Sequence, residues 1–296
     1  MRARRWALVA VFFGLVACSP ETTAPTVPEP PATTQTAPPA PTTTASVAPS
    51  STPPPTPTKA GSVEGPGPHG VETYLPVEPG GAPVAVLVHG GGWVGGLPAS
   101  MEPLGRALAE RGMVVFNASY RTLMAGGGYP ATFDDIACAV RYARSRAAEL
   151  GASDDLVLVG HSAGAHLAAA VALTGDAFGG DCSWEGSAVP GSLVGLAGIY
   201  RLENVAPVME ALLGGTREAL PEIWAAADPY KHLEAAGEVA VRIIHGLDDE
   251  IVPTSSSQDF AFALQQAGQE IAFELIEGAN HMDMIDPEVA APLIAP

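Results

Sequence analysis

The sequence predicts an α/β fold in which helices cover both faces of a mostly parallel sheet. Short apolar runs recur along the 296-residue chain from Val84 onwards, and each has the length of a buried strand. The longer segments between these runs carry apolar residues at helical spacing. Regular alternation of strand and helix is the pattern that gives parallel strands joined by crossover helices.

The expected strands are short and strongly apolar. Val71–Leu75 is interpreted as an edge strand and Val84–Val88 as a central one, because an unbroken apolar run suits a strand covered on both faces. Five more strands are predicted, at Met113–Ala118, Leu156–Val159, Leu193–Ala197, Val241–Ile244 and Ile271–Ile276.

The expected helices are recognised by their period. Ala131–Leu150 is the longest, with an apolar stripe made of Phe133, Ile136, Val140, Ala143, Ala147 and Leu150. Three more helices are expected, at Met101–Arg111, in the alanine-rich run that ends at Leu173, and at Ser255–Ala267.

An insertion is expected at about residues 199–236, with helical patches at Val205–Leu213 and Leu220–Ala227. The tail Pro287–Pro296 is short for a final helix.

Residues 1–17 are interpreted as an export signal. Three arginines precede the apolar stretch Trp6–Val16, which is too short to span a bilayer. The stretch leads into Leu15-Val16-Ala17-Cys18, which resembles a bacterial lipobox. The resemblance implies cleavage before Cys18, acylation of this cysteine, and a lipoprotein on the outer face of the bacterial cell membrane. Simple secretion is the alternative.

Residues 18–62 are expected to form the acylated cysteine and a disordered linker. Pro, Thr, Ala and Ser dominate this segment, and large apolar side chains are almost absent. Such a segment cannot bury enough surface to offset the entropy of ordering. The folded domain is therefore expected at residues 63–296.

The charge and the motifs exclude several classes of function. A formal net charge of −18 disfavours nucleic acid as a partner, and it disfavours anionic membrane surfaces too. The simplest consequence of this charge is solubility. No C-x-x-C motif or histidine-rich cluster indicates a metal site.

The chain has three cysteines, of which Cys18 is assigned to the anchor. Cys138 lies off the apolar stripe of its predicted helix, and Cys182 lies in a polar loop. Both would be outside the cytoplasm, where thiols oxidise. We predict a disulfide between Cys138 and Cys182, with two unrelated free thiols as the alternative.

The segment Leu156–Leu173 contains the clearest chemical motif, Gly160-His161-Ser162-Ala163-Gly164. An apolar strand precedes the motif and an alanine-rich helix follows it. This context is that of a nucleophile elbow, a tight turn that exposes the serine hydroxyl at the top of a sheet. Gly160 and Gly164 are needed because a side chain there would collide with the neighbouring strand or helix.

Three further motifs stand in a fixed order around this serine. They are His89-Gly90-Gly91-Gly92-Trp93, the segment His245–Pro253 (HGLDDEIVP), and Gly278-Ala279-Asn280-His281. Serine, then acid, then histidine is the chain order of α/β-hydrolases. From about Gly70 to the C-terminus the sequence resembles that superfamily. More narrowly, it resembles the HGGG-type esterases: hormone-sensitive-lipase-like carboxylesterases and small carbohydrate or feruloyl esterases. The resemblance implies the α/β-hydrolase fold, with the insertion over the active site.

The resemblance implies a catalytic triad. Ser162 would be the nucleophile and His281 the base that takes its proton. Three acidic residues, Asp248–Glu250, compete for the third place. The family pattern H-G-x-x-D-x-x-V-P, laid on His245–Pro253, selects Asp249, which would orient the imidazole and stabilise the imidazolium.

By the same resemblance, the backbone N–H groups of Gly91, Gly92 and Ala163 would form the oxyanion hole. Trp93 has two possible roles. It is a substrate-binding residue that walls the pocket or stacks on a sugar or aryl group, or it braces the loop.

The implied function is a serine carboxylesterase that hydrolyses short acyl or aryl esters through an acyl-enzyme, without a cofactor. A carbohydrate-side-chain esterase acting on acetyl or feruloyl groups is a variant. A non-catalytic binding protein on a hydrolase scaffold is the alternative from another class. Such proteins usually lose a triad member, whereas all three are available here.

Overall fold

The computed structural model describes residues 58–63, 70–234 and 239–295. The export signal, Cys18 and the linker as far as residue 57 lie outside the described residues, so their assignments stay predictions. Within the described ranges, no helix combines the length and the apolar character that crossing a membrane requires.

The described residues form one sheet of eight strands in the order β1-β2-β4-β3-β5-β6-β7-β8. The strands from β4 to β8 in this order are parallel, whereas β2 pairs antiparallel with both β1 and β4. All strands predicted from the sequence are present, with ends shifted by a residue or two. Their bounds are Thr58–Val63 (β1), Val71–Leu75 (β2), Val84–Val88 (β3), Val114–Ala118 (β4), Leu156–His161 (β5), Ser192–Leu196 (β6), Ala240–Gly246 (β7) and Ile271–Ile276 (β8).

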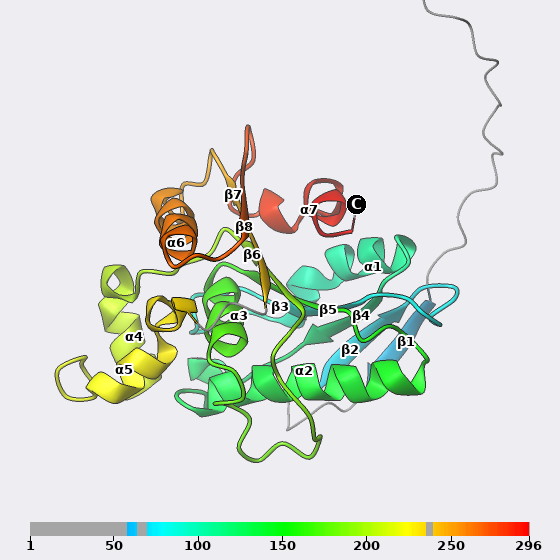
Figure 1. The fold of residues 1–296 in the computed structure, drawn as a ribbon, viewed down its shortest axis with the longest axis horizontal. Coiled ribbons are helices and arrows are strands. Elements are labelled where there is room, and N and C mark those ends of the chain that lie inside the picture. The colour runs from blue at the N-terminus through cyan, green and yellow to red at the C-terminus, as the bar shows by residue number, and fades with distance from the viewer. Residues whose placement is uncertain (1–57, 64–69, 235–238, 296) are drawn as a thin grey trace, which may run out of the picture. The chain divides into compact units, whose positions relative to one another are not determined.

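Helices cover both faces of the sheet (Figure 1). Helices α1 and α7 pack on one face, and α2, α3 and α6 pack on the other. This layered α/β arrangement confirms the fold class predicted from the sequence. The helices are Glu102–Glu110 (α1), Ala131–Glu149 (α2), Ala163–Leu173 (α3), Ala206–Leu213 (α4), Pro221–Ala227 (α5), Ser255–Gln266 (α6) and Pro287–Ile294 (α7).

Alternate residues of β3 supply two separate hydrophobic cores. Val84, Val86 and Val88 belong to the core beneath α2, α3 and α6. Ala85 and Leu87 belong to the core beneath α1 and α7. Successive side chains of a strand point to opposite faces, so a strand covered on both faces must be apolar throughout.

Strand β1 corrects the predicted domain boundary. The sequence predicts a linker as far as residue 62, but Thr58–Val63 pairs with β2, which is therefore not the edge strand. Backbone pairing does not depend on large side chains. The segment also contains no proline, unlike the residues before it, so every N–H is available to the ladder.

The tail also differs from expectation, because it folds as helix α7. The carboxylate of Asp286 caps this helix by accepting the N–H of Glu288 at 2.8 Å. Ala290 and Ala291 are buried in the core that α7 shares with α1. Tertiary packing of small residues thus stabilises a helix whose sequence is short and proline-rich.

The insertion contains α4 and α5 and packs beside α3 (Figure 1). The backbone N–H of Tyr129 donates to the carbonyl oxygen of Leu212, at the end of α4, at 2.7 Å. The insertion is therefore bonded to the loop before α2.

A disulfide joins Cys138 of α2 to Cys182, in the loop after α3, with the two Cα atoms 5.4 Å apart. The predicted pairing is thus present in the structure. Arg141, one turn further along α2, donates to the carbonyl oxygen of Phe178 at 3.0 Å and to the carboxylate of Asp176 at 3.1 Å. The same loop is therefore held to α2 by polar contacts as well.

Candidate active site

The motif residues gather at the carboxyl edge of the sheet. His89–Trp93 follows β3, Ser162 follows β5, Asp249 follows β7 and His281 follows β8. The strands β3, β5, β6, β7 and β8 are consecutive parallel neighbours, so their carboxyl ends lie along one edge. Segments that are far apart in the chain are thereby brought together.

Ser162 lies on a strained turn between β5 and α3, with φ 55° and ψ −121°. Residues with side chains rarely adopt such a positive φ, and the strain persists only where the surroundings hold it. Glycine is required on either side. A Cβ on Gly160 would overlap the backbone of Gly164, and a Cβ on Gly164 would overlap the carbonyl group of His89. The turn has the geometry expected of a nucleophile elbow.

His281 and Asp249 are hydrogen-bonded to each other. Nδ1 of His281 donates to Oδ2 of Asp249 at 2.7 Å. With Nδ1 donating, Nε2 is the ring nitrogen left to accept a proton. Asp248 and Glu250 are exposed, so of the three acidic residues in the run Asp249 is the one that contacts the imidazole.

The Asp249 carboxylate is fully buried and well satisfied. Its Oδ1 accepts the backbone N–H groups of Ile251 at 2.9 Å and Val252 at 2.8 Å. Burial by itself would raise the pKa of Asp249, but the hydrogen bonds from Val252, His281 and Ile251 outweigh it and lower the pKa below its usual value. The carboxylate is therefore ionised at neutral pH and suited to stabilise an imidazolium.

His161 links the serine turn to His281. Its Nε2 donates to the carbonyl oxygen of His281 at 3.0 Å, and the two rings lie 4.7 Å apart. Among the described residues, the Ser162 hydroxyl forms no hydrogen bond with the His281 ring. Catalytic hydrogen bonds are often long without substrate and tighten in the reacting complex.

The three expected oxyanion donors are the backbone N–H groups of Gly91, Gly92 and Ala163. In the part of the chain that the structure describes, none of the three donates to a protein acceptor. Ala163 is the first residue of α3, where N–H groups lack an intrahelical partner. These groups are free to bind a ligand oxygen.

The structure corrects the substrate-binding role of Trp93. Its side chain is 1 % exposed, and its indole N–H donates to Nδ1 of His166 at 3.1 Å. A ring buried in this way offers no face to a sugar or aryl group. Trp93 therefore braces the loop, which is the second of the two roles that the sequence leaves open.

His245 is a residue of the site that the sequence analysis missed. His245 is the penultimate residue of β7, and its ring is fully buried, with Nε2 3.0 Å from Oδ2 of Asp249. Burial lowers the pKa of His245, so the ring is neutral at neutral pH. The available signal was its place in the H-G-x-x-D pattern, four residues before Asp249.

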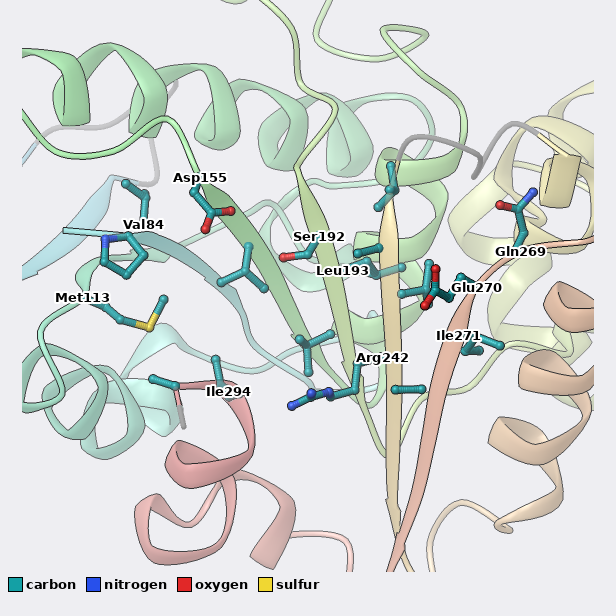
Figure 2. Close-up of a pocket in the computed structure, with 18 of the residues that line it drawn as sticks. Val84, Met113, Asp155, Ser192, Leu193, Arg242, Gln269, Glu270, Ile271 and Ile294 are labelled. Carbon is teal, nitrogen blue, oxygen red and sulfur yellow. The ribbon is translucent and has the colours of Figure 1, made fainter. Parts of the chain in front are cut away.

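A pocket of about 780 Å³ lies elsewhere, at the opposite edge of the sheet (Figure 2). Val84, Ser192 and Ile271, which line it, begin strands β3, β6 and β8, and Arg242 lies near the start of β7. These are the amino ends of the strands, whereas the motif residues follow the carboxyl ends. The pocket is therefore separate from the candidate active site.

Two curated relatives are esterases in name. A probable isoprenylcysteine α-carbonyl methylesterase of Arabidopsis thaliana is 29 % identical over 233 residues, which cover 72 % of this chain and 48 % of the relative. Esterase LipQ of Mycobacterium tuberculosis is 27 % identical over 228 residues, which cover 72 % of this chain and 53 % of the relative. The chain thus spans about half the length of these relatives.

Among solved structures, a thermophilic esterase from Thermogutta terrifontis with butyrate bound has a TM-score of 0.65 and 26 % identity. The match covers 76 % of this chain and 87 % of that one. The same esterase phosphonylated by sarin matches with the same TM-score. The BD-FAE family matches residues 71–264, from β2 into α6 and across the Ser162 and Asp249 motifs. Because this match covers more than half of its length, the chain belongs to the BD-FAE family and has the α/β-hydrolase fold.

Proposed function

We propose that this protein is a serine carboxylesterase. The observation that carries the proposal is the Asp249–His281 hydrogen bond at the edge of the sheet where the strained turn presents Ser162. A buried, ionised carboxylate that orients an imidazole beside such a serine is the arrangement that activates a nucleophile. A binding protein would not need a strained serine turn or a carboxylate fixed by four polar neighbours.

In the proposed reaction, Oγ of Ser162 attacks the ester carbonyl carbon while its proton passes to Nε2 of His281. The carbonyl oxygen becomes an oxyanion, which accepts hydrogen bonds from the N–H groups of Gly91, Gly92 and Ala163. His281 then gives the proton to the leaving alcohol, and the acyl group stays on Ser162. Water attacks the acyl-enzyme by the same route and releases the carboxylic acid.

The ligand of a solved neighbour supports short acyl esters as substrates. The Thermogutta terrifontis esterase was solved with butyrate, which is a short carboxylate. We therefore propose short acyl or aryl esters, with acetylated or feruloylated carbohydrates as the second substrate class. A panel of p-nitrophenyl esters of increasing chain length, alongside acetylated and feruloylated glycans, separates the two classes.

Ser162→Ala tests the proposed reaction. We expect the variant to remain folded and to lose at least about 10⁴-fold in kcat, because removal of the nucleophile stops acylation. A fluorophosphonate probe should label the wild-type protein and the control Ser183→Ala, which changes an exposed loop serine, but not Ser162→Ala. A folded wild-type protein that neither reacts with the probe nor hydrolyses esters would support the binding-protein alternative.

We also propose that acylated Cys18 anchors the protein at the outer face of the bacterial cell membrane. The arginine-rich start, the short apolar stretch and the lipobox-like Leu15–Cys18 support this localisation. Cys18→Ala should move the full-length protein from the detergent phase to the aqueous phase in phase separation. Unchanged partition would contradict the anchor.

A further inference from the structure

The loop that carries Gly91 and Gly92 contains a strained residue that has a side chain. Trp93 has φ 61°, and the two glycines before it have φ 125° and 61°. Residues with side chains rarely adopt such values, which persist only where neighbouring groups hold them. The place of the Gly91 and Gly92 N–H groups therefore depends on what fixes Trp93.

A buried histidine fixes this tryptophan. The indole N–H of Trp93 donates to Nδ1 of His166 at 3.1 Å, and the two rings meet edge to face with centroids 5.5 Å apart. His166 has no exposed surface and lies on α3, one turn after Ser162. One hydrogen bond thus joins the loop of the oxyanion donors to the helix that follows the nucleophile.

The second ring nitrogen of His166 contacts the insertion. An indole N–H only donates, so Nδ1 of His166 must accept and the ring proton must be on Nε2. Nε2 donates to the carbonyl oxygen of Ala227, the last residue of α5, at 2.9 Å. Burial lowers the pKa of His166 to about 4, so at neutral pH the ring is in the neutral form that these two bonds require.

We propose that His166 is a positioning residue for ester hydrolysis, which holds the oxyanion donors at a fixed place relative to Ser162 through the Trp93 indole. The inference rests on the proposed function, since the place of these donors matters only if an oxyanion forms. Donors of this kind act mainly in the transition state. Their displacement is therefore expected to lower kcat and to leave KM nearly unchanged.

Three variants test the proposed role of the Trp93–His166 hydrogen bond. His166→Leu removes the acceptor without adding a charge. His166→Asn keeps an amide oxygen near the place of Nδ1, and Trp93→Phe keeps a ring but removes the N–H donor. The matched control is Val171→Ala, a fully buried change five residues further along α3 that removes packing but no hydrogen bond.

We expect His166→Leu and Trp93→Phe to lower kcat for a short acyl ester by roughly 10- to 100-fold, with KM within about threefold of wild type. The rate of fluorophosphonate labelling at Ser162 should fall with kcat. His166→Asn should recover most of the lost rate. Val171→Ala should lower the unfolding midpoint and keep the wild-type kcat.

The inference is overturned if the folded variants keep kcat within threefold of wild type, or if Val171→Ala loses as much rate as they do. If His166→Leu does not fold, the kcat of Trp93→Phe alone tests the role proposed for His166. Measurements on the wild-type protein separate a failure of the proposed function from a failure of the role proposed for His166. An inactive, unlabelled wild type overturns the proposed function and this inference together, whereas an active wild type with equally active variants overturns only the inference.

Discussion

His245 and His281 contact the same carboxylate oxygen of Asp249: Nε2 of His245 lies 3.0 Å from Oδ2, and Nδ1 of His281 lies 2.7 Å from it. The N–H at Nε2 of His245 donates to the carbonyl oxygen of Val252 at 3.0 Å. Nδ1 of His245 lies 2.7 Å from the hydroxyl of Ser257, which must be the donor in that bond. The neutral ring therefore fixes both the carboxylate and the loop that follows it.

Replacing His245 should weaken catalysis without removing a triad member. We expect His245→Leu to lower kcat roughly tenfold, because the Asp249 loop loses the bond at Val252 and a polar neighbour of the carboxylate. Stability should also fall by about 1–3 kcal/mol, since the Val252 carbonyl and Ser257 hydroxyl lose a buried partner. Steady-state kinetics and urea unfolding measure both effects. Ser255→Ala, an exposed change nearby, is the control, and a folded His245→Leu with wild-type kcat would contradict the role.

Asp249→Asn should cost several orders of magnitude in kcat. The amide keeps the shape but loses the charge and can impose the wrong tautomer on His281, which lowers kcat by about 10⁴ in serine proteases. The matched control is the adjacent Asp248→Asn, which changes an exposed carboxylate and should cost little. Circular dichroism must show both variants folded before kcat is compared. A dead Asp248→Asn beside a nearly normal Asp249→Asn would place the acid one residue earlier.

The Cys138–Cys182 disulfide should contribute strongly to stability. It closes a loop with a sequence separation of 44 residues. Chain entropy alone predicts a stabilisation of about 4 kcal/mol for a loop of this size. Urea unfolding of the Cys138→Ser/Cys182→Ser double variant measures the difference from wild type. Alkylation under denaturing, non-reducing conditions tests the bond itself, since two modified thiols in wild-type protein would exclude it.

Stability should fall as the pH is lowered from about 6.5 towards 4. Burial lowers the pKa of four histidines below the usual 6.5, to about 4 for His161 and His166. Between these pH values the unfolded chain binds protons that the folded state does not bind, so the free energy of unfolding decreases as the pH falls. The lowered pKa of Asp249 acts in the same direction, because stability is also lost when this carboxylate is protonated at still lower pH. The four are His89, His161, His166 and His245.

Urea unfolding at a series of pH values checks this dependence. A free energy of unfolding that stays constant between pH 7 and pH 4.5 would show that the buried histidines take up protons in the folded state.

Local patterns in the sequence were enough for the order of strands and helices and for the nucleophile turn. An apolar run such as Val84–Val88 has one stable environment, a strand covered on both faces. The G-x-S-x-G motif is equally restrictive, because Gly160 and Gly164 sit where any side chain would overlap the backbone. The family spacing likewise singled out Asp249, the carboxylate that contacts His281 in the structure.

Contacts between distant elements were decided only by the tertiary structure. Hydrophobic period shows which face of a helix is buried, but not which side chain of another element meets it there. His166 looks like any core residue of α3 until the loop after β3 brings Trp93 against it. Strand β1 depends in the same way on the free edge of β2, because backbone pairing leaves almost no mark on a segment that lacks large apolar side chains. The sequence alone therefore determined the chemical groups and their order, and packing decided which buried side chains hold them in place.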